Sequence, residues 1–193
     1  MHDSFELEGS PSPLGVTWVE DEAAYNFALY SKHATAVTLL LYSEIDISTP
    51  TYERRLDPLA NKSGRIWHCR LRKSAIPEAR YYGYQVAGPS SQEQGHRFDP
   101  RKILLDPYAR CVCFPTRFSR AAASAPGSNA GKAPLGLIAT QPEDDWAGDE
   151  TPAHRSDLVI YELHVRGFTR RANSGVAPAH RGTFLGVMEK IPT

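Results

Sequence analysis

The sequence is poor in the residues that support several common classes of protein. Three cysteines, Cys69, Cys111 and Cys113, are too few and too odd in number for a disulfide framework, which predicts a reducing compartment. Lys plus Arg and Asp plus Glu both number 22, so the formal net charge is zero. No basic surface for nucleic acid or an anionic membrane is expected, whereas a neutral polymer is a compatible partner.

Long apolar runs are also missing. The longest, at 36–42, falls far short of the roughly 20 residues that a membrane-spanning helix needs. The N-terminus begins Met1-His2-Asp3, carries acids at Glu6 and Glu8, and has no basic region followed by an apolar core. No export signal is predicted. We therefore expect a cytoplasmic protein that does not enter the membrane.

What the sequence does contain is a series of short apolar segments separated by turn residues, the pattern of strands. Asn61 and Gly64 tolerate the left-handed backbone region and predict a hairpin turn between the fourth and fifth strands. Trp67, Cys69 and Leu71 should share one face of a strand. About half a dozen such strands predict a β-sandwich. The predicted strands lie at 14–18, 25–29, 37–42, 52–56, 66–71, 81–87 and 111–114.

The segment that follows the strand at 81–87 is punctuated by prolines. Gly88-Pro89 breaks the strand, since Pro89 has no N–H to donate to a ladder. Asp99-Pro100 and Asp106-Pro107 keep the residue before each proline extended and offer carboxylates to nearby backbone N–H groups. They bracket an apolar run at 103–105. We expect this segment to pack the end of one domain against the next rather than to bind a ligand.

The composition changes near residue 119. Residues 119–134 are rich in Ala, Ser, Gly and Pro, which predicts a linker over 116–156. A dense strand-type run at 158–165 follows, and 183–191 can begin a helix that Pro192 would stop. A β-then-α unit therefore starts near the end of the sequence.

Several short motifs, all in one order, resemble the N-terminal part of isoamylases and glycogen-debranching enzymes of glycoside hydrolase family thirteen. The match covers most of the chain. Its main motifs are Asn26-Phe27-Ala28-Leu29-Tyr30-Ser31, Tyr82-Gly83-Tyr84, Gly95-His96-Arg97-Phe98, Leu105-Asp106-Pro107-Tyr108 and Tyr161-Glu162-Leu163-His164-Val165.

The resemblance implies a mainly β protein with three parts. An immunoglobulin-like sandwich of carbohydrate-binding module family forty-eight would occupy 14–115, a linker 116–156, and the first strand and helix of a truncated (β/α)8 barrel 157–193. The resemblance also implies a full enzyme that hydrolyses α-1,6 branch points in glycogen or related α-glucans. This chain would be its N-terminal fragment, acting as a scaffold.

No catalytic, cofactor-binding or metal-binding residue is assigned. Retaining glycoside hydrolysis needs two carboxyl groups about 5–5.5 Å apart, and the resemblance implies that the family's catalytic acids lie on later barrel strands. The chain alone is therefore expected to be inactive.

Four local patterns could indicate a catalytic, metal-binding or sugar-binding site, but each has a simpler interpretation. Asp144-Asp145 is interpreted as solvated linker charge, and Glu162 and His164 as packing and hydrogen-bonding residues. Cys111-Val112-Cys113 has no second ligand pair at metal-site spacing. Aromatic residues could stack on sugar rings, but at strand spacing they are more often buried, so we expect weak or no glucan binding. These aromatics are Trp18, Tyr25, Tyr30, Tyr42, Trp67, Tyr81, Tyr82 and Tyr84.

Two alternatives stay open. The chain could be a free-standing glucan-binding or regulatory module, although such a module has no use for an apolar strand at 158–165. It could also be part of a branching or trehalose-releasing relative, although the spacing of Gly95-His96-Arg97-Phe98 and Asp106-Pro107-Tyr108 favours debranching.

Overall fold

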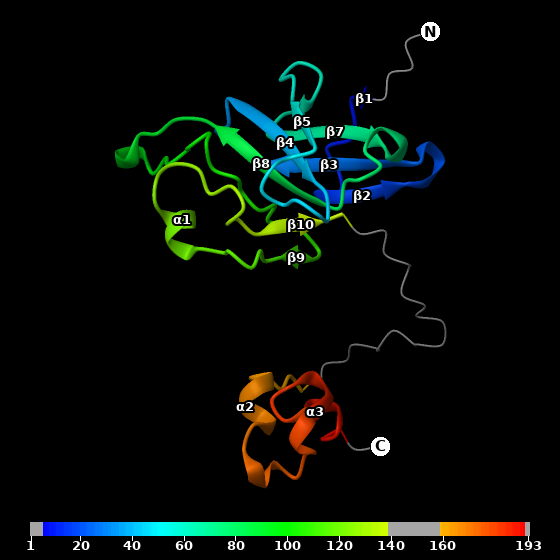
Figure 1. Ribbon diagram of the computed structural model, residues 1–193, viewed down its shortest axis with the longest axis vertical. Helices are drawn as coiled ribbons and strands as arrows, with labels where there is room; N and C mark the ends of the chain where they lie inside the picture. Colours follow the sequence, from blue (N-terminus) through cyan, green and yellow to red (C-terminus); the bar gives the residue numbers. More distant parts are fainter. Residues whose placement is uncertain (1–5, 139–158, 192–193) are drawn as a thin grey trace. The chain divides into compact units, whose positions relative to one another are not determined.

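The computed structural model describes residues 6–138 and 159–191. The chain divides into two compact units, Met1–Asp144 and Asp145–Thr193 (Figure 1). None of the helices in the described ranges is long and apolar enough to cross a membrane.

The first unit contains two antiparallel sheets. One has the strand order β1-β7-β3-β2, and β6 also pairs with β7. Its central pair, β3 and β7, is registered with Phe27 opposite Cys69. The strands of this sheet are β1 (Glu6–Leu7), β2 (Gly15–Val19), β3 (Ala24–Tyr30), β6 (Lys62–Ser63) and β7 (Ile66–Arg72).

The second sheet has the order β5-β4-β8-β10-β9. Its central pair, β4 and β8, is registered with Leu39 opposite Tyr84. The strands are β4 (Ala36–Tyr42), β5 (Tyr52–Arg55), β8 (Tyr81–Ala87), β9 (Val112–Cys113) and β10 (Leu135–Leu137). Short 3-10 helices at Glu20–Glu22, Lys73–Ala75 and Gln92–Gln94, and helix α1 (Arg120–Ser124), lie in the connections.

The two sheets bury a common core. Trp67, Cys69 and Leu71 all belong to it, as their spacing predicted, and they meet Phe27 and Tyr82. The Phe27 and Tyr82 rings contact edge to face with centroids 5.6 Å apart. A mainly β protein with an immunoglobulin-like sandwich is therefore confirmed.

The predicted hairpin between 52–56 and 66–71 is wrong. Strand β5 pairs with β4 in the second sheet, whereas β7 belongs to the first sheet. The tight turn instead joins β6 to β7, with Ser63 opposite Ile66 and Gly64 at φ +61. Gly64 thus has the predicted conformation, but the turn connects a shorter hairpin because β5 stays with β4 in the second sheet and the chain changes sheet only after β5.

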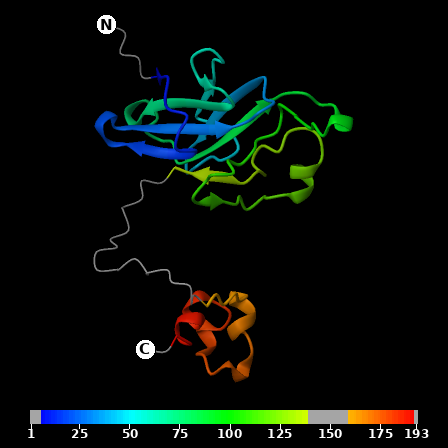
Figure 2. The ribbon, with the colours of Figure 1, turned by 180° about the vertical axis from the view of Figure 1, so that it is seen from behind.

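The linker predicted at 116–156 is corrected over its first part, and residues 139–156 lie outside the described ranges. Arg120–Ser124 forms α1 and Leu135–Leu137 forms β10, which pairs with both β8 and β9. Figures 1 and 2 both show this yellow-green segment beside β8. A second cluster buries Leu40, Tyr42, Ile103, Ala133 and Leu135. Strand β4 is therefore covered on both faces, which its unbroken Leu-Leu-Leu-Tyr run at 39–42 requires.

The second unit is small and helical where it is described. It contains α2 (Val165–Thr169), α3 (Phe184–Met188), and 3-10 helices at Ala172–Ser174 and Pro178–His180. The predicted helix near 183–191 is confirmed, with the Thr183 side chain capping α3. The strand predicted at 158–165 is not seen over its described part: residues 159–164 form no strand, and α2 begins at Val165. Residue 158 itself lies outside the described ranges.

Candidate ligand-binding cleft

A cleft lies over the loop that follows β8. Gly88 directly follows that strand, and a side chain at this position would place its Cβ only 2.7 Å from the Phe98 ring. Glycine at position 88 therefore lets the loop fold back, so that Phe98 packs over the strand end and against the inter-sheet core. The sequence break at Gly88-Pro89 thus positions the Gly95-His96-Arg97-Phe98 motif.

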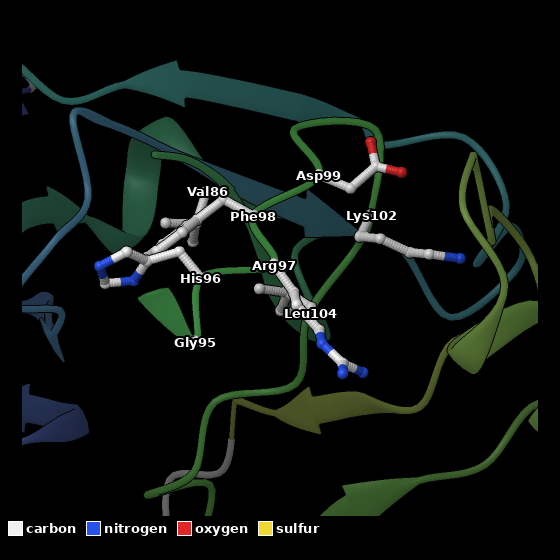
Figure 3. Close-up of a pocket in the computed structure, with 8 residues that line it drawn as sticks. All are labelled: Val86, Gly95, His96, Arg97, Phe98, Asp99, Lys102 and Leu104. Atoms are coloured by element: carbon white, nitrogen blue, oxygen red, sulfur yellow. The ribbon is translucent and has the colours of Figure 1, made fainter. Parts of the chain in front are cut away.

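Figure 3 shows the cleft, which has a volume of about 250 Å³. Val86, Phe98 and Leu104 supply apolar surface. Among the eight labelled residues that line the cleft, His96 lies near one end and Lys102 near the other. A second, larger hollow of about 670 Å³ shares the 97–99 wall and reaches the residues after α1.

Asp99 is fully engaged in holding the loop. Its carboxylate accepts hydrogen bonds from the Arg101 backbone N–H at 3.0 Å and Nε at 3.1 Å, and from the Gly127 N–H at 2.7 Å. The hydrogen bond from the Arg101 side chain, followed by the backbone bonds, lowers the pKa of Asp99. Asp99 therefore joins the loop to the segment after α1.

Lys102 is the buried cation of the cleft, with 8 % of its surface exposed. Its ammonium donates to the carbonyl of Ala122 in α1. A cation bonded to a carbonyl near a helix C-terminus is favourable. Lys102 thus has a structural role, and Arg97, which is exposed, is the cation that faces solvent.

The strand-like segment below the cleft is fixed on both sides. Leu104 exchanges backbone hydrogen bonds with Tyr84 at 2.7 and 3.0 Å. The buried Asn129 side chain accepts from the Ile103 N–H at 2.8 Å and donates to the Ile103 carbonyl at 3.0 Å. Sequence reasoning missed Asn129, because an asparagine in a Pro-Gly-Ser-Asn run is typical of a turn.

Asp106 anchors the end of this segment. It is 1 % exposed, and its carboxylate accepts from the Tyr82 hydroxyl at 2.9 Å and the Tyr108 N–H at 2.8 Å. Burial raises the pKa of Asp106, and the two hydrogen bonds oppose that shift. The Asp106-Pro107 step therefore acts inside the fold of the first unit.

Two histidines meet at the edge of the cleft. The rings of His33, which follows β3, and His96 have centroids 4.5 Å apart and an interplanar angle of 59°. The His96 and Phe98 centroids are 6.3 Å apart. The His33 side chain is exposed; slight desolvation, followed by the charges of His96, Lys32 and Arg65, lowers its pKa. The contact between them was not predicted from the sequence, because only the fold brings residues 33 and 96 together.

The aromatic residues named from the sequence are mostly core. Tyr25, Tyr42, Trp67, Tyr82 and Tyr84 are each at most 2 % exposed. Trp18 is partly buried and packs edge-on against Tyr25, with centroids 4.9 Å apart. Tyr81 is also partly buried, and Tyr30 is 49 % exposed.

Sequence reasoning missed one exposed aromatic pair. Phe114 and Phe118 are 61 % and 42 % exposed, with perpendicular rings whose centroids are 5.2 Å apart. Their four-residue separation falls outside any strand or helix, so no periodicity marked them.

The remaining candidate residues of the described ranges are not among those that line the cleft. Glu162 is exposed, and His164 Nδ1 accepts from the Gly167 N–H at 3.0 Å as the N-cap of α2. Cys111 and Cys113 are partly buried free thiols. Among the described residues, no cluster of three or more His, Cys, Asp or Glu side chains could hold a metal ion. Asp144 and Asp145 lie outside those residues.

Comparison with known proteins assigns this fold to a family. The profile of carbohydrate-binding module 48, the isoamylase N-terminal domain, matches residues 13–109, just over half of the 193-residue chain. The match covers most of the sandwich, including the cleft loop, and ends before α1 and β10.

Two curated relatives illustrate the similarity in sequence. Isoamylase 1, chloroplastic, of Arabidopsis thaliana is 38 % identical over 191 residues, covering 97 % of this chain and 23 % of the relative. The glycogen debranching enzyme of Yersinia enterocolitica is 38 % identical over 185 residues, covering 93 % of this chain and 26 % of the relative. The chain therefore spans about a quarter of the length of these relatives.

Solved structures share the fold at lower identity. The pullulanase SAP of group B Streptococcus aligns over 94 % of this chain and 22 % of its own, with a TM-score of 0.59 and 20 % identity. A pullulanase of Paenibacillus barengoltzii, solved with maltotriose, aligns over 91 % of this chain and 23 % of its own, with a TM-score of 0.56 and 21 % identity.

Proposed function

The chain belongs to the carbohydrate-binding module 48 (isoamylase N-terminal domain) family, and on that premise we propose that it serves as the N-terminal scaffold of a debranching glycoside hydrolase. The enzyme of which it forms part would cleave α-1,6 branch points in glycogen or a related α-glucan. The sandwich supplies a rigid support, and the hydrolytic carboxyl groups come from elsewhere.

One observation carries this proposal. The alignments with the Arabidopsis isoamylase and the Yersinia debranching enzyme cover 97 % and 93 % of the chain. They therefore continue past residue 109, where the family profile ends, through the second unit. A sandwich used as an independent binding module would need similarity only over the sandwich.

The prominent acids of the first unit already have structural partners. Asp99 is bonded to Arg101 and Gly127, and Asp106 is buried against Tyr82 and Tyr108. Retaining hydrolysis would need a pair of carboxyl groups about 5–5.5 Å apart and open to a glycosidic bond. We therefore expect this chain alone to release no reducing sugar from glycogen, limit dextrin or pullulan.

A segment exchange tests the scaffold proposal. Residues 1–193 would replace the matched segment of the Yersinia enterocolitica glycogen debranching enzyme, and branch-point hydrolysis of glycogen would be measured. We expect a soluble chimera with at least about a tenth of the parent activity. This corresponds to an increase of at most about 1.4 kcal/mol in the activation free energy. The parent enzyme lacking the segment is the control. A folded chimera no more active than that control would contradict the scaffold role, as would hydrolysis by this chain alone.

A weak glucan contact at the cleft is the second candidate. Phe98 and Leu104 provide apolar surface, while His96 and Arg97 provide hydrogen-bonding groups beside it. A sugar ring can pack its C–H face on the apolar surface and form hydrogen bonds through its hydroxyl groups. Contacts to one or two rings supply limited free energy, so we expect a dissociation constant of about 1 mM or weaker for maltotetraose.

NMR titration of the chain with maltotetraose measures this contact directly. Arg97→Ala should weaken binding several-fold, whereas Arg120→Ala on α1, outside both hollows, should not. Saturation at micromolar glucan, or equal binding by both variants, would place the glucan contact elsewhere.

A further inference from the structure

The His33–His96 contact joins two elements that are far apart in the sequence. His33 lies between β3 and β4, whereas His96 lies in the loop after β8. Their ring centroids are 4.5 Å apart, a separation that leaves no room for intervening water. The contact therefore ties the cleft loop to the β3–β4 turn through two titratable side chains.

The cleft loop has few other ties at this end. The His96 and Gly95 backbone N–H groups bond to Ser91 and Gln92 within the same loop, at 2.9 and 3.0 Å. These bonds shape the loop without attaching it to the sheet. Phe98, packed against Gly88, supplies the next attachment along the chain. The histidine contact thus holds the outer half of the loop at the edge of the cleft.

The charges around the contact are mainly of one sign. His33 faces His96, Lys32 and Arg65, all of which oppose its protonation. Glu93 and Arg97 are the charged residues of the loop beside His96. Among the described residues, the histidine that forms an ion pair is His180 of the second unit, with Glu189. The same cations and the lack of a third ligand argue against a metal site at the contact.

From this geometry we propose that the His33–His96 contact is a pH-sensitive latch: it holds the 95–98 loop against the β3–β4 turn while His33 is neutral and releases it when His33 gains a proton. The charge that His33 gains lies against His96, and His96, Lys32 and Arg65 all oppose it. Release would widen the cleft at the His96 end and move Phe98, on which the proposed glucan contact depends.

The direction of the pH dependence follows from the lowered pKa of His33. A histidine whose folded-state pKa lies below its ordinary value of 6.5 binds protons less readily in the closed state. The contact is therefore fully stable above pH 6.5 and weakens progressively as the pH falls below that value.

NMR titration of the unliganded full chain between pH 4.5 and 8 tests the latch without any glucan. The His33 ring signals should titrate below 6.5, and the backbone amide shifts of residues 95–98 should change with the same midpoint. In His96→Asn the His33 midpoint should rise towards 6.5, and in His33→Asn the amide response of the loop should be lost. His180→Asn, in the second unit, is the matched control and should leave both readouts unchanged.

Two outcomes would overturn the latch. One is an ordinary His33 midpoint that does not change in His96→Asn. The other is titration of His33 with no response at 95–98. Binding of maltotetraose at pH 7.5 and at pH 5 then separates the two proposals: a latch that titrates in a chain without measurable glucan affinity at either pH leaves the latch standing and refutes the glucan contact.

Discussion

The two units of this protein bury their apolar residues to very different extents. In the sandwich, the large side chains Trp67, Phe27 and Tyr82 are at most 1 % exposed. In the second unit, Val159 and Ile160 are 88 % and 83 % exposed. The exposed set there continues with Tyr161, Phe168, Phe184, Leu185, Met188 and Ile191.

The contrast shows how each unit is stabilised. The sandwich closes two sheets over one core and covers the outer face of β4 with a second cluster. The second unit buries Thr169 and Val176 but leaves most of its large apolar side chains in contact with solvent. The described part of the second unit therefore has much less buried apolar surface to stabilise it than the sandwich has.

Truncation should give the largest effect and separate the units cleanly. A chain ending at residue 138 keeps β10 and should unfold at nearly the same temperature as the full chain. A chain ending at 115 loses Leu135 and Ile138, which are 2 % and 3 % exposed. At roughly 1.5–3 kcal/mol for each buried aliphatic side chain, we expect a loss of about 3–6 kcal/mol. Urea unfolding of both chains measures it.

The matched controls sharpen this comparison. A peptide of residues 159–193 should show little helix by circular dichroism, since helices of this length are marginal in water. Equal stability of the chains ending at 115 and 138 would mean that α1 and β10 are dispensable, as a linker would be.

A pair of phenylalanine truncations compares the two units side chain by side chain. Phe27→Ala removes a ring that is 1 % exposed and should lower the free energy of unfolding by about 3–5 kcal/mol. Phe184→Ala removes a ring that is 75 % exposed and should change it by no more than about 0.5 kcal/mol. Comparable losses in chemical denaturation would show that α3 is covered in solution.

Asp106 offers a pH test confined to the sandwich. Burial raises its folded-state pKa above the ordinary 3.8, so the native state binds the proton more tightly than the unfolded state. Its contribution to stability is fully present below pH 3.8 and is lost as the pH rises through the folded-state pKa. Asp106→Asn removes this contribution, which decreases as the pH rises. Just above pH 3.8, the stability of the variant should therefore rise more steeply with pH than that of the wild type. Denaturation at several pH values compares the slopes. Asp21→Asn, at an exposed position of the 3-10 helix after β2, is the control, and an unchanged slope in Asp106→Asn would contradict the prediction.

The smallest expected effect lies in the second unit. The Thr183 hydroxyl accepts from the Gly186 N–H at 3.3 Å as the N-cap of α3. Thr183→Ala should destabilise that helix by about 1 kcal/mol and leave the melting of the sandwich unchanged. Amide exchange at Val187, which bonds to the Thr183 carbonyl, reports the change. Thr183→Ser, which keeps the hydroxyl, should behave like the wild type, and a shift in sandwich melting would show that the units are coupled.

The sequence by itself determined most of the longer strands of the sandwich and the class of fold, because such a strand leaves a local signature. Alternation at Trp67, Cys69 and Leu71 marked a buried face, and Gly88-Pro89 marked where β8 ends. The motif order placed the chain in its family. These features depend only on residues a few positions apart, so they can be identified in the sequence alone.

Only the tertiary structure decided the partners of each strand and the composition of the cleft. Strand β5 pairs with β4, the strand before it, rather than with β7, and β10 joins β8 over a separation of more than fifty residues. These pairings build two sheets that bury one apolar core. The same closure brings His33 to His96 and Asn129 to Ile103. No local pattern links such positions, since the free energy that joins them comes from burial and hydrogen bonding in the finished fold.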